Sequence, residues 1–414
     1  MTPPGRAPLL LPQIAIFCAS VAMLLLYSGG WALPLFGENA DESAAGFMRV
    51  AYLPAYAVGF LLIALNPRNM FRVLLRQPLL IILMLVVIGS TAWSIAPDVT
   101  TRRAFAVTCT TLGGLALAAR YKWAELAEVV GATFIVLIVG SFVAALAVPS
   151  IGVMTELFPG AWRGLWMEKN GLGGLMALGF CLLSAAALLN PQRAKLWWPF
   201  AGLALVLVLM STSKTSLASL LVGAAALAFV LIARRSPAAG AAITWTGVTG
   251  AVLLGGFLLV ASDVFFALLG KDATLTGRTE IWSAAMRQIE LRPWTGYGYA
   301  AVWDNKSGWG PFAWITKDAG FQAHHAHNSW IEQWLGMGII GLAAWGLFYL
   351  QTLALAIIAV FRDRGALLVF PFLVVYTLVS LTESIAVVYN DFRWALFVAF
   401  AAKLAFSDRE QERR

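Results

Sequence analysis

Long apolar segments alternate with short polar interruptions along nearly the whole chain. A helix that crosses a membrane needs about 20 predominantly apolar residues. Segments of about that length can be marked off twelve times, and this pattern predicts twelve membrane spans. The predicted spans are residues 14–36, 44–65, 78–95, 104–119, 126–148, 172–189, 196–211, 216–233, 241–262, 330–360, 366–385 and 392–406.

The composition favours a membrane protein over a soluble one. Of the 414 residues, 60% are hydrophobic and 12% are charged, and a soluble core cannot bury that much apolar surface. We expect an all-α polytopic protein with one transmembrane domain over residues 1–414. The first apolar run is too long for a cleaved signal peptide, so it is predicted to remain as the first span. The three cysteines lie inside apolar segments, where they are typical packing residues.

The distribution of basic residues alternates between the loops that connect the predicted spans. Arg and Lys cluster in every second interruption, for example at residues 68–76, 120–122 and 362–364. Short cytoplasmic loops are enriched in these residues. The pattern therefore predicts that both termini face the cytoplasm, while the acidic residues 37–43 and the long segment 263–329 face the other side. This topology explains most of the net charge of +8, so we expect no nucleic-acid partner.

The long outer segment, residues 263–329, exceeds an ordinary connection and is rich in Trp, Gly and Tyr, which predicts a large loop outside the membrane. Residues 281–289 carry apolar side chains at roughly helical spacing, Thr276 or Gly277 can open a helix, and Pro293 follows its end. We therefore expect a short amphipathic helix outside the membrane. Arg278 would lie in its first turn, where the helix dipole disfavours a cation. An anionic ligand would explain that position, and contact with lipid headgroups is the alternative.

All three histidines, His324, His325 and His327, lie within four positions, directly before an apolar run. Imidazole titrates near neutrality and serves in acid–base catalysis and in metal binding. The cluster has no nearby cysteine and no clear carboxylate pattern, which makes it a weak metal signature. We expect no metal site, and contacts at the membrane interface are the simpler explanation for His324 and His325.

Five short motifs resemble the O-antigen ligase and polysaccharide polymerase (Wzy) superfamily, and most closely its exopolysaccharide polymerase (ExoQ-type) branch. They occur in the family's order and spacing between about residues 150 and 400. The motifs are RGLWMEKNGLGG, STSKTSLASLL, TGRTEIWSAAMRQIELRPWTGYGYAAVW, AHNSWIEQWLGMGIIGL and TESIAVVYNDFRWAL.

The resemblance implies a multi-pass glycosyltransferase of GT-C-like architecture in the bacterial inner membrane. Such an enzyme takes a glycan linked to undecaprenyl pyrophosphate on the periplasmic side. It transfers the glycan to a hydroxyl of another lipid-linked repeat or of lipid A-core. The resemblance implies no metal, cofactor or nucleotide sugar. Membrane lipids and a chain-length regulator are further expected partners.

Cations on the outer side fit a donor with a pyrophosphate leaving group. Arg163 and Arg278 match the motif arginines of the family, and a guanidinium can hold phosphate oxygens through two parallel hydrogen bonds. Both are therefore predicted to stabilise the charge that develops as the glycosidic bond breaks. Lys169 and Lys214 are additional candidates for substrate binding. For Lys214, a loop lysine that reaches toward the membrane surface is an equally good interpretation.

The AHN motif of the family falls on His327 and Asn328. The resemblance therefore implies that His327 acts on the acceptor hydroxyl, as a general base or as the group that orients it. Asn328 would fix this histidine or cap the helix that follows. Glu383 matches the acidic position of the last motif, and a carboxylate near the end of a span is expected to pair with an arginine of the site. Glu332 could tune His327, or it could be only a polar residue at a helix start.

Polymerase activity is the function that the sequence favours, with an O-antigen ligase acting on lipid A-core as the alternative. A transporter of lipid-linked oligosaccharides is a more distant one. A transporter should carry polar residues deep in several spans, whereas the charges that topology does not explain gather on one side. A purely structural scaffold would leave the outer Arg, His and Asn residues without a role.

Overall fold

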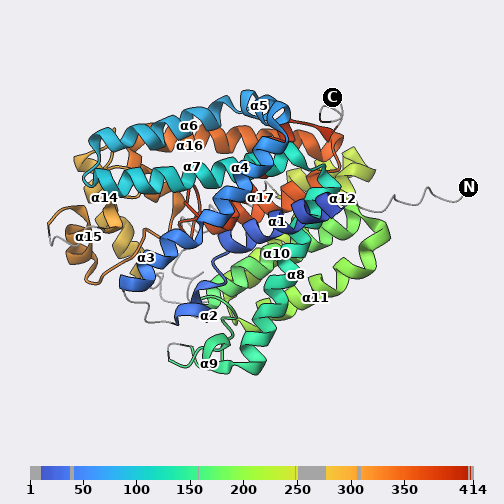
Figure 1. Ribbon diagram of the computed structural model, residues 1–414, viewed down its shortest axis with the longest axis horizontal. Coiled ribbons are helices and arrows are strands. Elements are labelled where there is room, and N and C mark those ends of the chain that lie inside the picture. Colours follow the sequence, from blue (N-terminus) through green and yellow to red (C-terminus); the bar gives the residue numbers. More distant parts are fainter. Residues whose placement is uncertain are drawn as a thin grey trace, which may run out of the picture. The chain divides into compact units, whose positions relative to one another are not determined.

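The computed structural model describes residues 11–37, 42–156, 158–247, 249, 277–304, 309–408 and 411. In these residues the regular secondary structure is helical. The only β-type pairing among them is an isolated β-bridge between Val153 and Trp162. Helices lie on eleven of the twelve predicted spans. The remaining span, 241–262, falls mostly outside the described residues. The predicted all-α class is confirmed for the described part of the chain (Figure 1).

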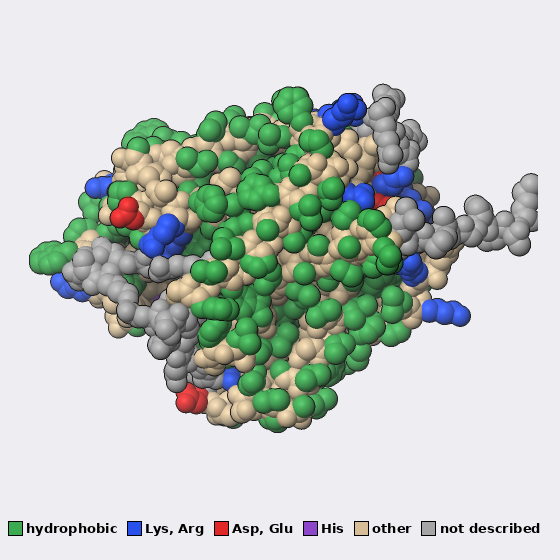
Figure 2. All heavy atoms as spheres, viewed as in Figure 1, with side chains coloured by type: hydrophobic (Ala, Val, Ile, Leu, Met, Phe, Trp, Pro, Cys, Tyr) green, Lys and Arg blue, Asp and Glu red, His purple; other side chains and the backbone are tan. Residues whose placement is uncertain are grey.

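The number of spans is not confirmed. Six described helices are long and apolar enough to cross a membrane, or seven if the bent pair Pro67–Leu75 and Pro78–Trp93 forms one span. Other predicted spans correspond to shorter or more polar helices. The segment 366–385 differs in detail, because its helix ends at Ser380 and residues 381–391 continue as turns. Apolar side chains cover much of the face shown in Figure 2, as expected where helices meet lipid.

The chain divides into two compact units. Unit 1 contains Met1–Val73, Cys109–Ala218 and Asn390–Arg414, and unit 2 contains Leu74–Thr108 and Ser219–Tyr389. The helices of unit 1 are α1 (Leu11–Tyr27), α2 (Ala32–Phe36), α3 (Glu42–Ala51), α4 (Leu53–Leu65), most of α5 (Pro67–Leu75), the second half of α7 (Pro97–Arg120), α8 (Trp123–Ala147), α9 (Pro149–Gly152), α10 (Lys169–Leu189), η2 (Pro191–Arg193), α11 (Ala194–Met210), the start of α12 (Lys214–Arg235) and α18 (Phe392–Ala405).

Small residues allow the helices of unit 1 to pack closely. Helix α10 packs against both α8 and α11, and most of its residues are buried (Figure 1). A Cβ atom at Gly131 would lie 2.7 Å from the Trp197 ring, and one at Gly179 would lie 2.7 Å from the Phe134 ring. Glycine at these positions therefore lets aromatic side chains contact the backbone of the next helix, as is common in membrane bundles.

Unit 2 holds the predicted outer helix. Its helices are α6 (Pro78–Gly89), η1 (Ser90–Trp93), the first half of α7, most of α12, α14 (Arg278–Leu291), η4 (Val302–Asp304), α15 (Pro311–Ala319), α16 (Ser329–Arg362) and α17 (Ala366–Ser380). Helix α14 begins directly after Gly277 and ends before Pro293, as predicted. It packs with α15 and the start of α16 around Ala284, Ile289, Tyr297, Ile315 and Leu335.

Helix α16 is broken at Gly338, which has φ 66° and ψ −168°. Residues 293–298 lie along the break and form hydrogen bonds on both sides of it. The N–H of Gly298 donates to the Gly336 carbonyl at 2.7 Å, and the N–H of Ile339 donates to the Pro293 carbonyl at 2.8 Å. The predicted span 330–360 is therefore two helical parts, because a second backbone segment supplies the hydrogen bonds that the helix loses.

Candidate functional site

Residues 326–328 of unit 2, called the AHN turn below, directly precede α16 and are hydrogen-bonded to its first turn. The Oδ1 atom of Asn328 accepts hydrogen bonds from the N–H groups of Trp330 at 2.9 Å and Ile331 at 3.1 Å. These bonds satisfy donors that an α-helix leaves open at its first turn. The Asn328 amide also donates to the Leu381 carbonyl at 3.2 Å. The predicted capping role of Asn328 is thus confirmed, and the same side chain links the turn to the segment after α17.

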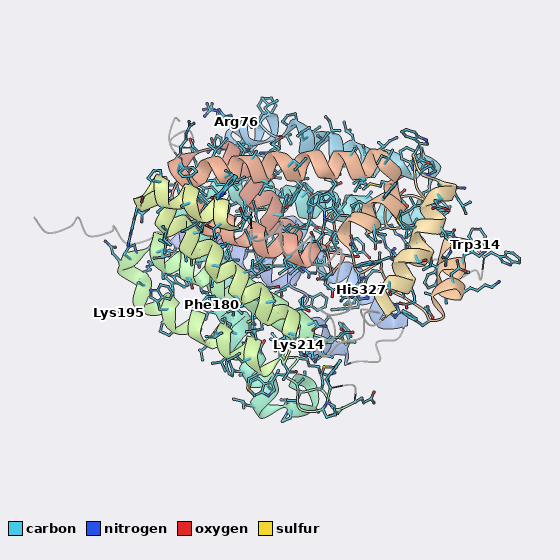
Figure 3. All side chains as sticks on the ribbon, turned by 180° about the vertical axis from the view of Figure 1, so that it is seen from behind. Arg76, Phe180, Lys195, Lys214, Trp314 and His327 are labelled. Carbon is cyan, nitrogen blue, oxygen red and sulfur yellow. The ribbon has the colours of Figure 1, made fainter. Side chains whose placement is uncertain are left out.

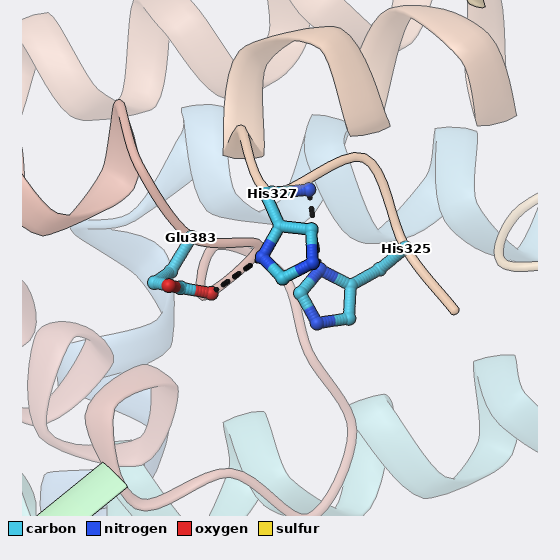
Figure 4. Close-up of side chains that lie close together, drawn as sticks. All are labelled: His325, His327 and Glu383. Atoms are coloured by element: carbon cyan, nitrogen blue, oxygen red, sulfur yellow. Dashed lines mark hydrogen bonds and ion pairs between the residues drawn. The ribbon is translucent and has the colours of Figure 1, made fainter. Parts of the chain in front are cut away.

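His327 adopts a left-handed backbone conformation, with φ 50°. This conformation is uncommon for a residue with a side chain and is stable only where neighbours enforce it. The Nδ1 atom of His325 accepts the His327 N–H at 3.1 Å, and the two rings lie 3.8 Å apart between centroids (Figure 4). His325 therefore helps to hold His327 in place.

Glu383 joins the predicted arginine and the predicted histidine. Its Oε1 atom lies 2.8 Å from Nη2 of Arg278. Its Oε2 atom lies 3.1 Å from Nδ1 of His327, as Figure 4 shows. The expected pairing of Glu383 with an arginine of the site is confirmed. Three residues from separate segments of the sequence thus form one chain of hydrogen bonds, Arg278–Glu383–His327.

Ser329 fixes the position of the Glu383 segment. Its hydroxyl donates to the Glu383 carbonyl at 2.8 Å and accepts the N–H groups of Ile385 at 2.9 Å and Ala386 at 3.2 Å. Ser329 is fully buried, so these contacts are shielded from water. The carboxylate of Glu383 is therefore positioned by the first residue of α16, two positions after His327.

The local environment sets the protonation states of two groups in the site. Burial acts to raise the pKa of Glu383, but the hydrogen bond with His327 and the charges of His327 and Arg278 outweigh it, so the pKa lies below its usual value. Burial, followed by the neighbouring His327, lowers the pKa of His325 to about 4. Near neutral pH, Glu383 is therefore a carboxylate, and His325 is neutral and can accept the His327 N–H.

Glu332 is hydrogen-bonded to the AHN turn and to two neighbouring segments. Its carboxylate accepts hydrogen bonds from the Ala326 N–H at 2.9 Å, the Trp303 indole N–H at 2.5 Å and the Ser384 hydroxyl at 3.2 Å. These contacts connect η4, the AHN turn and the Glu383 segment. Glu332 thus positions the backbone beside His327, and the suggestion that it tunes His327 stays a prediction.

The predicted cations of unit 1 gather at one of its ends, around the loop before α10 and the turn between α11 and α12. Arg163 is buried, and its Nε and Nη2 atoms donate to the carbonyls of Ile151 at 2.7 Å and Ser150 at 2.9 Å. The Nζ atom of Lys169 lies 3.5 Å from the hydroxyl of Thr212, in the turn that precedes Lys214. Lys214 is exposed at the start of α12, and Lys195 lies at the other end of α11 (Figure 3). Arg163 thus stabilises a loop, and its predicted role in catalysis remains a prediction.

His325, Ser329 and Ser384 are site residues that the sequence alone did not indicate. Serine is a common helix-start residue, so its presence after the AHN motif carries no specific signal. His325 was visible as part of the histidine cluster, but its contact with His327 depends on the turn geometry, which sequence spacing does not reveal.

A metal ion has one candidate position among the described residues. His325, His327 and Glu383 each offer a ligand atom, and these atoms lie within 4.8 Å of one another. In the structure the His325 Nδ1 atom and both Glu383 oxygens already form hydrogen bonds. A cation would have to displace these partners, including the positively charged Arg278, so the geometry favours an ion-pair network.

The low pKa of His325 predicts a pH dependence of stability. An unfolded histidine takes up a proton near pH 6.5, whereas His325 in the folded protein does so only near pH 4. The unfolded state therefore binds more protons in this window, and stability falls as the pH drops from 6.5 to 4. We expect the His325→Asn variant, whose amide can still accept a hydrogen bond, to lose less stability than wild type between pH 7 and pH 5.

Between pH 7 and pH 5, wild type should lose on the order of 1–3 kcal/mol more unfolding free energy than His325→Asn, measured from unfolding midpoints in detergent. His324→Asn is the matched control, since His324 is exposed. An identical pH response of wild type and His325→Asn would contradict the assigned protonation state.

Comparison with known proteins gives two matches. Residues 199–346 match the O-antigen ligase family, a range that contains Lys214, Arg278, His327 and Asn328. The chain is also 33% identical over 194 residues to the exopolysaccharide production protein ExoQ of Rhizobium meliloti (strain 1021). That alignment covers 43% of this chain and 43% of the relative, so the chain spans less than half of the relative's length.

Proposed function

We propose that the protein belongs to the O-antigen ligase and polysaccharide polymerase superfamily and that it polymerises a lipid-linked glycan. The match of residues 199–346 to the O-antigen ligase family and the similarity to ExoQ support this proposal. The donor is a glycan on undecaprenyl pyrophosphate, and the acceptor is a hydroxyl of a second glycan. The hydroxyl oxygen forms a bond to the anomeric carbon, the bond to the lipid pyrophosphate breaks, and the hydroxyl proton is removed. The product is a longer exopolysaccharide or O-antigen chain.

The observation that carries this proposal is the Arg278–Glu383–His327 chain. An ionised Glu383 can only accept hydrogen bonds, so Nδ1 of His327 carries the proton that it donates to Oε2. In the neutral imidazole that a general base requires, Nε2 of His327 then carries the lone pair that can take the proton of the acceptor hydroxyl. Glu383 also stabilises the positive charge that His327 gains when it takes the proton, as carboxylates do for catalytic histidines elsewhere.

Arg278 is the residue we assign to the donor pyrophosphate. Its Nη2 edge faces Glu383, and a guanidinium has five N–H donors, enough to hold a carboxylate and a phosphate together. A cation at this position stabilises the negative charge that develops on the leaving pyrophosphate. Arg163, Lys169 and Lys214 remain candidates for donor binding, and no metal or cofactor is needed for these steps.

The chemistry is proposed to take place at the periplasmic side of the bacterial inner membrane. The alternation of basic loops supports this orientation, with both termini in the cytoplasm. Membrane lipids surround the helices, and a chain-length regulator is a proposed partner. Ligation to lipid A-core is the alternative function, since the site geometry suits any sugar hydroxyl. A transporter would move the lipid-linked glycan without forming a new bond.

The proposal is tested with purified protein, lipid-linked glycan repeats and, in a parallel reaction, lipid A-core. We expect longer glycans from repeats alone and no requirement for lipid A-core. Arg278→Lys should lower this rate at least about tenfold, because an ammonium cannot make the planar contacts of a guanidinium.

Arg287→Lys is the matched control, because Arg287 lies on the same helix and pairs with Asp318 at 2.9 Å on the surface. It should retain most of the activity. Products formed only with lipid A-core would indicate a ligase, and donor movement without a new glycosidic bond would indicate a transporter. Equal activity of the Arg278 and Arg287 variants would remove Arg278 from the mechanism.

A further inference from the structure

Unit 1 contains a partly open pocket of about 990 Å³ that includes none of the residues proposed for catalysis. Its walls come from the start of α1, the corner between α4 and α5, the corner between α7 and α8, and η2. The side chain of Gln411, beyond α18, completes the lining. Five segments that are distant in sequence thus line one pocket.

Cations outnumber carboxylates around this pocket. Arg68, Arg72, Arg120, Lys122 and Arg193 line it, together with Glu125 and Glu128. The two carboxylates are already engaged within the protein. Glu128 pairs with Arg193 at 2.9 Å, and Glu125 accepts the backbone N–H of Lys122 at 3.0 Å in a helix capping box. The lining therefore carries an excess of positive charge, to which Arg68 of α5 and Arg120 at the end of α7 contribute.

Apolar side chains form another wall of the same pocket. Ile14 and Phe17 of α1 and Leu65 of α4 line it, and Ile14 and Leu65 are 43% and 49% exposed. In a protein with membrane-spanning helices, such exposed side chains face lipid tails. The pocket therefore joins a cationic part to an apolar part, which is the arrangement that an anionic lipid requires.

We propose that this pocket binds an anionic phospholipid, with the phosphate near Arg68 and Arg120 and an acyl chain along Ile14 and Leu65. Topology alone needs only that basic residues lie in the loops on one side. Here they converge on one cavity with an apolar wall, as in lipid headgroup sites between membrane helices. The basic loops place the pocket at the cytoplasmic leaflet, where anionic lipids are abundant. The proposal is independent of the proposed enzymatic activity.

Lipid binding is measured with the full-length protein in detergent, by native mass spectrometry after addition of phosphatidylglycerol or phosphatidylcholine. We expect wild type to retain phosphatidylglycerol in clear preference to phosphatidylcholine. One basic side chain near a membrane surface contributes about fivefold in affinity, so the Arg68→Gln/Arg120→Gln variant should bind phosphatidylglycerol about 25-fold more weakly. Arg68→Lys/Arg120→Lys keeps the charge and should stay within about threefold of wild type.

Lys195→Gln is the matched control, since Lys195 is an exposed cation of unit 1 outside the pocket lining. It should bind as wild type does. Millimolar inorganic phosphate should not displace the lipid, because phosphate has no acyl chain to occupy the apolar wall. Equal retention of the two lipids by wild type would overturn the proposal even if the glutamine variant failed to fold. Displacement by inorganic phosphate, or unchanged binding in a folded glutamine variant, would overturn it as well.

Discussion

His327→Ala is expected to lower glycan transfer by about 10²–10⁴-fold, the range for loss of a general base. The variant should still bind the lipid-linked donor, because the contact between Arg278 and Glu383, 2.8 Å in the structure, does not involve the imidazole of His327. In cells the donor should therefore accumulate while long glycans disappear. The two readouts are the yield of lipid-linked repeats and the length distribution of the polysaccharide, with the amount of protein in the membrane measured in parallel.

His324→Ala is the control for this experiment, since His324 is exposed and close to the AHN turn. It should keep most of the activity. Wild-type activity should also survive EDTA, because arginine supplies the positive charge in the proposed mechanism. Near-normal transfer by His327→Ala, combined with loss of wild-type activity in EDTA, would instead support a metal ion held by His325 and Glu383.

Gly338→Ala is expected to destabilise the protein by at least roughly 3 kcal/mol. The backbone angles of Gly338, φ 66° and ψ −168°, belong to a region that only glycine adopts readily. A Cβ atom there would lie 2.1 Å from the Trp294 carbonyl oxygen, well inside van der Waals contact. The nearest atoms all belong to the backbone of Trp294 and Thr295, so no change of side-chain rotamer can relieve the clash. Thermal unfolding in detergent and the yield of monodisperse protein measure the effect.

Gly346→Ala provides a comparison within the same helix. Gly346 is helical, and a Cβ atom there would meet only the Trp330 ring at 3.7 Å, an ordinary contact. Alanine favours helix over glycine by up to about 1 kcal/mol, so this variant should be as stable as wild type or slightly more stable. If both alanine variants unfolded at the same temperature, the break in α16 would not have the rigid geometry described above.

Local features of the sequence were sufficient to predict several parts of the structure. Apolar runs marked eleven segments that contain helices, because lipid-facing and buried helices both require them. The start of α14 followed from a glycine before an amphipathic repeat and a proline after it. The pairing of Glu383 with an arginine, which the structure identifies as Arg278, followed from the unfavourable free energy of a carboxylate near the membrane without a partner.

Features that depend on distant contacts were not predicted. The break in α16 lies in an apolar run with no proline, and glycine alone does not stop a helix in a membrane. It forms because residues 293–298 supply hydrogen bonds at that point. The buried contacts of Arg163 with the carbonyls of Ser150 and Ile151 were missed for a similar reason. A motif match indicates that an arginine is present, but not which groups its donors reach.

The segment that bridges the break in α16 also constrains the order in which unit 2 can be completed during synthesis. The N–H of Tyr299 donates to the Ser90 hydroxyl, 209 positions earlier in the chain, and the adjacent Gly298 binds α16, which the ribosome has yet to make. Glu383 lies 105 positions after Arg278 in the sequence. A nascent chain therefore contains Arg278 and His327 before their shared carboxylate has been synthesised, and the site can take its final form only after α17 and the segment with Glu383 have been made.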